Sequence, residues 1–171
     1  MKLNLGCGNC KREGYVNCDI SEDVKPDKII DLEKKLPFKD DTVTDIYSRH
    51  TFEHITNFMQ LMEEIWRICK NGARIEIIVP YFAHPGAFWD PTHKRFFTLR
   101  TFDYFRGDGQ LSYYSKARFK ILSKKIVFFV TRPKISRFFD SVINKIQSFY
   151  ERFLSRIFPA EELRFVLEVE K

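Results

Sequence analysis

The first part of the sequence predicts two short strands joined by a glycine loop. Residues 2–5 alternate as a strand does, and Gly6-Cys7-Gly8 follows directly. A second strand pattern, residues 15–19, ends on Asp19. At the strand ends of an open α/β sheet, glycines admit a ligand close to the backbone, and a carboxylate accepts hydrogen bonds from ribose hydroxyls. The pattern therefore predicts parallel strands that hold an adenosine between Gly6, Gly8 and Asp19.

The spacing of this motif argues against a dinucleotide. In the dinucleotide fingerprint a third glycine opens a helix, and the acid comes about 20 residues after the glycines. Here Asp19 follows Gly8 by 11 residues, and no third glycine lies in the expected place. No full helix fits between the two strands, so a pyrophosphate would lack the helix N-terminus that normally binds it.

The following residues continue the strand and helix pattern. Short strands are predicted at residues 28–31 and 45–48, and a buried strand at 74–79, which Pro80 closes. Between them, apolar residues from Phe58 to Cys69 recur at three- and four-residue spacing, and Asn71-Gly72 is typical of a helix stop. This order predicts a parallel sheet covered by helices.

The second half of the chain has a different character. Residues 81–106 lose periodicity, which indicates a long loop with one helix near 101–105. Residues 119–129 and 163–169 look like an antiparallel pair of strands at the sheet edge. Between them, at about 133–158, apolar residues keep a helical spacing with Lys and Arg off the stripe, which predicts an amphipathic helical insertion.

Composition limits the protein class and the partners. A chain of 171 residues fits one domain, and no apolar run approaches the roughly 20 residues that span a bilayer. The start lacks the pattern of a secretory signal, and the four cysteines look like reduced thiols, so we expect a cytoplasmic protein. Residues 1–80 carry 12 Lys/Arg against 14 Asp/Glu, whereas residues 81–171 carry 17 against 9. The basic, aromatic second half favours an anionic acceptor, a nucleic acid or a membrane face.

A longer set of motifs resembles a known family. The matching segments are Leu3-Asn-Leu-Gly-Cys-Gly8, Gly14-Tyr-Val-Asn-Cys-Asp19, Asp31-Leu32, Leu36-Pro-Phe38, Asp45-Ile-Tyr-Ser48, Phe52-Glu-His54 and residues 62–72. Over about residues 1–105 the sequence resembles the class I S-adenosylmethionine-dependent methyltransferases of the type 11 kind, in particular small members with a truncated first helix. The resemblance implies a Rossmann-like three-layer α/β sandwich with a mostly parallel sheet and an antiparallel last strand.

The resemblance also implies a cofactor, S-adenosylmethionine, with S-adenosylhomocysteine as product. The residues that would contact it are Gly6, Cys7, Gly8, Ser48, Arg49 and His50 at the methionine part, Asp19 at the ribose, and Asp31 and Leu32 at the adenine. We expect one domain over residues 1–171, with a cofactor-binding half at 1–80 and a substrate and lid half at 81–171. Because the first helix is nearly absent, another segment must close part of the cofactor pocket.

Methyl transfer to an oxygen needs a base near the strand ends. We predict His93, His54 and Glu53 as the catalytic residues and favour His93 as the base, because it lies in the aperiodic segment and imidazole titrates near neutral pH. His50 and His84 are further candidates. An anionic acceptor, such as a phosphorylated sugar, a glycan or lipid intermediate, or RNA, would be contacted by cationic side chains, with Lys94, Arg95, Arg100 and Lys116 as candidates.

Other interpretations of these residues stay open. Gly6-Cys7-Gly8 could be a plain tight turn, and Asp19 or Asp31 a helix cap. Cys7-x-x-Cys10 has a redox or metal spacing but no second cysteine pair, and His84, Asp90 and His93 could hold a metal in a facial arrangement. We nevertheless predict no metal.

The function and the late apolar stripe also have alternatives. A non-catalytic adenosine-binding or scaffolding protein, or an RNA-binding module, could use the same fold. The stripe at residues 135–158 could be core, lid, homodimer interface or membrane-surface element.

Overall fold

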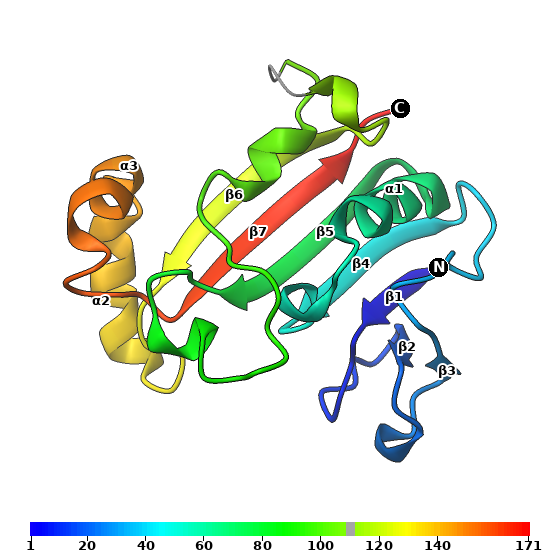
Figure 1. The fold of residues 1–171 in the computed structure, drawn as a ribbon, viewed down its shortest axis with the longest axis horizontal. Helices are drawn as coiled ribbons and strands as arrows, with labels where there is room; N and C mark the ends of the chain where they lie inside the picture. The colour runs from blue at the N-terminus through cyan, green and yellow to red at the C-terminus, as the bar shows by residue number, and fades with distance from the viewer. Residues whose placement is uncertain (109–111) are drawn as a thin grey trace.

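A computed structural model describes residues 1–108 and 112–171 of the chain. In these residues seven strands form one sheet in the order β3-β2-β1-β4-β5-β7-β6 (Figure 1). The strands are β1 (Lys2–Leu5), β2 (Val16–Asp19), β3 (Lys28–Ile29), β4 (Val43–Arg49), β5 (Cys69–Pro80), β6 (Phe119–Val127) and β7 (Glu162–Val169). The helices are α1 (Phe58–Ile68), α2 (Pro133–Ile143) and α3 (Gln147–Phe149).

The sheet is mostly parallel. Strands β1 to β5 pair with their neighbours in parallel, whereas β7 lies between β5 and β6 and is antiparallel to both. The α/β fold with an antiparallel last strand, predicted above, is therefore confirmed. Because parallel strands end at one edge, the loops after β1, β2, β4 and β5 meet there.

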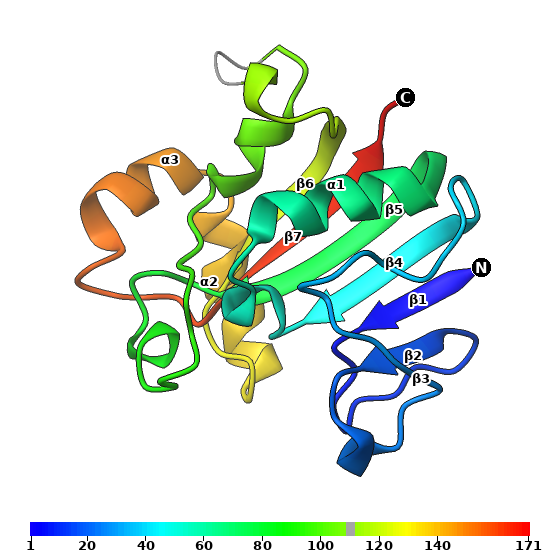
Figure 2. The same cartoon turned by 45° about the vertical axis from the view of Figure 1, so that its right-hand side comes forward.

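Helix α1 covers one face of the sheet (Figure 2). It begins at Asn57, whose side chain accepts a hydrogen bond from the Gln60 backbone N–H. Its apolar stripe, with Leu61, Met62 and Ile65 at the centre, is fully buried against the apolar side chains of the sheet. The helix predicted from this periodicity is therefore confirmed. Its apolar stripe stabilises the helix because it packs on another apolar surface.

The end of this helix differs from the sequence prediction. The prediction that the helix stops at Asn71-Gly72 is wrong, because α1 ends at Ile68 and β5 begins at Cys69. Gly72 does have a left-handed backbone, with φ of 75°. It lies inside β5, where the register with β4 shifts between Val43 and Asp45. The glycine thus supports a bulge in a strand rather than a helix terminus.

The opposite face of the sheet has little helical cover. The chain passes from β1 to β2 through a loop, and Asn17 binds that loop by accepting from the Arg12 N–H and donating to the Arg12 carbonyl. The Arg12 guanidinium then stacks on Tyr47 of β4, 3.8 Å from the ring centre. Polar strand residues and this loop therefore occupy the place of the truncated first helix, and the second helical layer of the predicted sandwich is reduced.

The aromatic second half closes the core on the α1 side. The predicted short helix is confirmed at Thr101–Phe105. Its residue Phe102 packs against Phe58 of α1 and Phe165 of β7, with ring centres 5.8 and 4.7 Å apart. The long loop after β5 is thereby fixed against the sheet.

The late insertion is not one helix. The prediction of an unbroken helix over 133–158 is wrong, because α2 ends at Ile143, α3 spans Gln147–Phe149 and a π-helical turn follows at Tyr150–Leu154. Many apolar side chains of this insertion are exposed, among them Ile135, Phe138, Phe139, Val142, Ile146, Phe149, Phe153, Ile157 and Phe158. Within the described residues, no helix is long and apolar enough to cross a membrane.

Candidate functional site

Two cavities open at the carboxyl ends of the parallel strands. The first, of about 380 Å³, is called the glycine-loop cavity here, and it is lined by Gly6, Gly8, Asp19, Ile20, Ile30, Asp31, Leu32, Glu33, His50, Thr51, His54, Ile55 and Lys94. The second, of about 760 Å³, is called the histidine cavity, and it is lined by Arg49, His50, Glu53, His54, Pro80, His84, Gly86, Trp89, Asp90, Pro91, His93, Val130, Glu161 and Glu162. The cavities adjoin, because His50 and His54 line both.

The glycine loop has a backbone that other residues rarely adopt. Gly6 and Gly8 have φ of 67° and 47°. A Cβ at Gly6 would lie 2.1 Å from Oγ1 of Thr51, whereas nothing lies within 4 Å of a Cβ at Gly8. Gly6 is thus needed for close packing, while Gly8 leaves open space for a ligand beside the backbone.

Asp19 connects this loop to the second strand. Its Oδ2 accepts from the Gly8 backbone N–H at 2.8 Å, and its Oδ1 accepts from the Ser21 N–H at 3.0 Å. Each carboxylate oxygen has a further lone pair, so the group can still accept from two hydroxyls. A residue that both shapes the loop and keeps acceptor capacity suits a ribose.

The remaining wall of the glycine-loop cavity comes from the residues that follow β3 and from the loops after β4 and β5. Ile30 and Leu32 are buried apolar residues, as an adenine face requires. Glu33 accepts backbone N–H groups of Thr56 and Asn57; burial raises the pKa of Glu33, but these bonds outweigh it and lower the pKa.

Lys94, in the long loop after β5, also lines the glycine-loop cavity. Its backbone N–H donates to the Glu53 carbonyl at 2.8 Å, and its Nζ donates to Oγ1 of Thr56 at 2.8 Å. Lys94 Nζ also lies 3.8 Å from the Glu33 carboxylate. Sequence reasoning had placed Lys94 with the acceptor instead.

Three residues predicted to bind the cofactor do not line this cavity. Cys7 is buried, and its backbone N–H donates to the Cys18 carbonyl. Ser48 is buried, and its hydroxyl donates to the Leu5 carbonyl of the neighbouring strand. Arg49 lines the histidine cavity and pairs with Glu162 at 2.9 Å.

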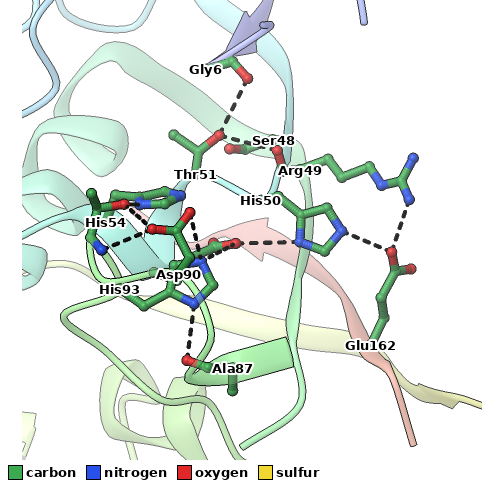
Figure 3. Close-up of polar contacts among 12 residues, drawn as sticks. Gly6, Ser48, Arg49, His50, Thr51, His54, Ala87, Asp90, His93 and Glu162 are labelled. Carbon is green, nitrogen blue, oxygen red and sulfur yellow. Dashed lines mark hydrogen bonds and ion pairs between the residues drawn. The ribbon is translucent and has the colours of Figure 1, made fainter. Parts of the chain in front are cut away.

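His50 lies at the boundary of the two cavities and has a strained backbone, with φ of 51°. Its Nε2 lies 2.9 Å from Glu162 and its Nδ1 3.3 Å from Glu53 (Figure 3). Burial lowers the pKa of His50, but the hydrogen bonds to Glu162 and Glu53 outweigh it and raise the pKa to about 9. Burial raises the pKa of Glu162, while His50 and Arg49 lower it to about 2. His50 is therefore a cation at neutral pH that bridges two carboxylates.

The three predicted catalytic residues come together in the histidine cavity. Ligand atoms of Glu53, His54 and His93 all lie within 4.8 Å of one another, and the two imidazoles meet edge to face at 4.8 Å between ring centres. The Nδ1 of His93 lies 2.9 Å from the Ala87 carbonyl, and the Nδ1 of His54 lies 2.8 Å from Oγ1 of Thr92 (Figure 3).

The other predicted residues lie outside this cluster. His84 lines the histidine cavity but accepts from the Gly86 N–H within its own turn and lies outside the Glu53 cluster. Arg95 donates to the carbonyls of Ile55 and Thr56. Arg100 and Lys116 are exposed and do not line either cavity. None of the four cations expected to contact an anionic acceptor thus lines the histidine cavity, whose charged lining includes four carboxylates.

Sequence reasoning missed several lining residues. Thr51 and Glu33 lie beside recognised motifs and could have been found by their position. Glu162 could not, because it lies 112 residues from His50 and reaches it only through the antiparallel pairing of β7 with β5.

Comparisons with known proteins show which proteins this chain resembles. A sequence profile of the methyltransferase-domain family matches residues 3–77. A search among curated proteins finds no significant sequence match.

Solved structures share the fold. An S-adenosylmethionine-dependent methyltransferase from Archaeoglobus fulgidus is 19% identical with a TM-score of 0.60, and the match covers 98% of this chain and 85% of that one. A Haloferax volcanii protein solved in complex with the Trm112 methyltransferase activator is 16% identical with a TM-score of 0.62, over 99% and 82%. The [4+2]-cyclase SpnF is 12% identical with a TM-score of 0.64, over 99% and 75%. The resemblance inferred from the motifs is confirmed.

Proposed function

From the premise that the chain resembles the class I methyltransferases in sequence over residues 3–77 and in its whole fold, we propose that it binds S-adenosylmethionine and transfers its methyl group to an acceptor in the histidine cavity. The observation that carries the proposal is the pair of adjoining cavities, one with the glycine loop and Asp19, the other with titratable side chains. His50 and His54 lie between them, where donor and acceptor would meet.

The residues present fit this cofactor. Gly8 offers a backbone with no side chain in the way, Asp19 can accept from the ribose hydroxyls, and Ile30 and Leu32 offer an apolar surface for the adenine. When bound, the cofactor supplies an electrophilic methyl on a sulfonium.

The protein's part in the reaction is to position the acceptor, exclude water and receive a proton. The histidine cavity holds Glu53, His54 and His93 as groups that can manage the proton of an acceptor hydroxyl. His50 and Arg49 provide positive charge beside Glu162, which keeps this wall of the cavity ordered. His93→Ala should spare cofactor binding and lower turnover.

The acceptor class follows from the lining of the histidine cavity. Glu53, Asp90, Glu161 and Glu162 outnumber the cations Arg49 and His50. This balance favours a neutral hydroxyl-bearing acceptor, such as a sugar of a glycan, over a free phosphate.

Calorimetry with S-adenosylmethionine and S-adenosylhomocysteine tests the cofactor assignment. Asp19→Ala would also release Gly8, so Asp19→Asn is the sharper variant, because the amide oxygen can still accept from the Gly8 N–H. Loss of a charged hydrogen bond costs about 1.5–3 kcal/mol, which is roughly a 10- to 150-fold weaker affinity. Asp23→Asn, on an exposed turn nearby, is the control and should bind as the wild type does. Equal affinities for Asp19→Asn and wild type would remove the ribose assignment.

A second function fits the same fold. SpnF, with this topology, is described as a cyclase, so the fold does not specify methyl transfer. If the chain binds both cofactor forms but no labelled methyl group reaches any glycan, lipid or RNA fraction, a non-catalytic adenosine-binding role replaces the enzyme. RNA binding that falls with salt and needs no cofactor would instead favour the RNA-binding module.

A further inference from the structure

The cluster of Glu53, His54 and His93 contains a buried oxygen to which none of the residues that the structure describes forms a hydrogen bond. The Glu53 side chain is 1% exposed, and its Oε1 is bound by His50. Its Oε2 is buried and has no hydrogen-bond partner among residues 1–108 and 112–171. A buried carboxylate oxygen left in this way costs free energy, so such groups are normally paired or bind a cation.

The ring of His93 is fixed so that one nitrogen is available to a ligand. Its Nδ1 lies 2.9 Å from the Ala87 carbonyl, which can only accept, so Nδ1 carries the proton. In the neutral ring Nε2 then has a lone pair. This Nε2 lies 4.0 Å from Oε1 of Glu53 and 3.9 Å from Oδ2 of Asp90, distances too long for hydrogen bonds.

His54 is held in the same manner through a hydroxyl. The single proton of the Thr92 hydroxyl goes to Oδ1 of Asp90, at 2.6 Å, so Oγ1 accepts from Nδ1 of His54 at 2.8 Å. The Nε2 of His54 is thereby left with a lone pair. Histidines that bind metal ions usually donate their second ring N–H to a carbonyl or carboxylate in this way, which fixes ring orientation and tautomer.

We propose that Glu53, His54 and His93 form a binding site for one divalent transition-metal ion in the histidine cavity. Two imidazoles and one carboxylate suit Zn²⁺, Fe²⁺, Co²⁺ or Ni²⁺ better than Mg²⁺ or Ca²⁺, which prefer oxygen ligands. The ligand atoms lie within 4.8 Å of one another. Two ligands of a tetrahedral ion, each about 2.1 Å from it, lie about 3.4 Å apart, so side-chain movements of about 1 Å would complete the site.

The position of the site indicates what a bound ion would do in the reaction, and this role rests on the proposed function. Three protein ligands leave open coordination positions, and all three residues line the cavity where the acceptor would lie. The ion would bind an acceptor oxygen and orient it toward the glycine-loop cavity. The proposed site differs from the sequence prediction of no metal and from the alternative ligand set of His84, Asp90 and His93. In this site His93 acts as a metal ligand rather than as the base.

The test measures metal binding in the full-length protein, without any cofactor. After dialysis against a chelator, titration with Zn²⁺ by calorimetry and elemental analysis should find one ion per chain. Glu53→Gln and His54→Ala should each weaken binding by more than about 100-fold, because they remove a ligand. His84→Ala is the matched control, since it removes a histidine of the same cavity outside the cluster, and it should bind Zn²⁺ as the wild type does.

Two further measurements keep the test independent of folding and of the methyltransferase reaction. Bound Co²⁺ should show visible absorption bands that change when Glu53→Gln replaces the carboxylate, and thermal unfolding of each variant shows whether it folds. Thr92→Val, which removes the hydroxyl behind His54, should weaken Zn²⁺ binding by about 10- to 100-fold.

The outcomes separate the two proposals. No Zn²⁺ binding to the wild type, or equal binding to Glu53→Gln, overturns the metal site. Zn²⁺ binding without S-adenosylmethionine binding would leave the site standing and overturn the proposed function. Mg²⁺ binding in preference to Zn²⁺ would also contradict the assignment.

Discussion

At the scale of the residue, the glycine loop depends on two separate constraints at Gly6. Its φ of 67° is unfavourable for any residue with a Cβ, and that Cβ would overlap Thr51. The left-handed backbone costs about 1–2 kcal/mol, and overpacking adds about 1–3 kcal/mol. Gly6→Ala should therefore lower the free energy of unfolding by about 2–5 kcal/mol in a denaturant titration.

Gly14→Ala is the control for the backbone alone. Gly14 has φ of 76°, and nothing lies within 4 Å of a Cβ built there. Its alanine variant should lose only about 1–2 kcal/mol. Equal losses at the two positions would show that the contact with Thr51 is not rigid.

A second prediction at the scale of the residue concerns how Glu162 makes the stability of the protein depend on pH. It faces Arg49 and His50 across the strands and Arg164 on its own strand. Because its pKa falls from 4.5 to about 2 on folding, the stability it contributes is present above about pH 4.5 and is lost as pH falls toward 2. Since its partners are partly exposed, we expect about 2 kcal/mol rather than the full linkage value.

Denaturant titrations at several pH values check this contribution. The difference in unfolding free energy between wild type and Glu162→Gln should be largest above pH 4.5 and shrink between pH 4.5 and 3. Glu168→Gln, on the same strand but without bonds to Arg49 or His50, is the control. A difference that stays constant over this range would contradict the assigned pKa.

At the scale of the element, α2 protects the edge of the sheet. Strand β6 is an edge strand, and Asn144, just after α2, both accepts from the Ile126 N–H and donates to the Ile126 carbonyl at 2.8 Å. An amide side chain thus takes the place of a neighbouring strand at this point, and it occupies two backbone groups that an edge strand would otherwise offer to another chain.

Asn144→Ala should destabilise the protein by about 1–3 kcal/mol, because it leaves both groups of a buried residue unpaired. Hydrogen exchange of the Ile126 amide should become faster in the same variant. Ser141→Ala removes an exposed hydroxyl that bonds only within α2, and it should change stability by less than about 0.5 kcal/mol. Unchanged exchange at Ile126 would show that the edge is covered by something else.

At the scale of the whole molecule, the insertion that contains α2 and α3 lies at one end of the sheet (Figure 1). Many of its apolar and basic side chains are exposed. It exposes four phenylalanines, Phe138, Phe149, Phe153 and Phe158, each more than half accessible. Its exposed cations are Arg132, Lys134, Arg137, Lys145, Arg152 and Arg156, and its two acids, Asp140 and Glu151, are bound inward. This charge favours an anionic membrane surface as the partner.

Sedimentation with phosphatidylglycerol vesicles tests that partner. Binding should fall as salt rises, and the combined change Phe138→Ser, Phe149→Ser and Phe153→Ser should weaken it by more than about tenfold, because each ring buries apolar area worth up to about 3 kcal/mol. Tyr113→Ser with Leu122→Ser, two exposed apolar residues elsewhere, is the control. A protein that dimerises in solution and ignores vesicles would make this surface a homodimer interface.

The sequence by itself determined the elements whose signals are local. Period-two and period-three patterns, the glycine loop and the acid after β2 specify the parallel strands, α1 and the glycine-loop cavity, because side-chain periodicity and backbone φ act within a few residues. It also predicted Glu53, His54 and His93 as catalytic residues, and the structure brings the three together in the histidine cavity. Their role in the reaction stays a prediction.

Only the tertiary structure decided the rest. The pairing of β7 with β5 brings Glu162 to His50, and the loop after β5 brings His93 to Glu53. These contacts join residues between 40 and 112 positions apart, and no periodic pattern encodes them, since they depend on how the whole sheet is ordered. The end of α1 at Ile68 and the break of the insertion after α2 depend on tertiary structure for the same reason. Each is set by how the neighbouring strands pair in the sheet.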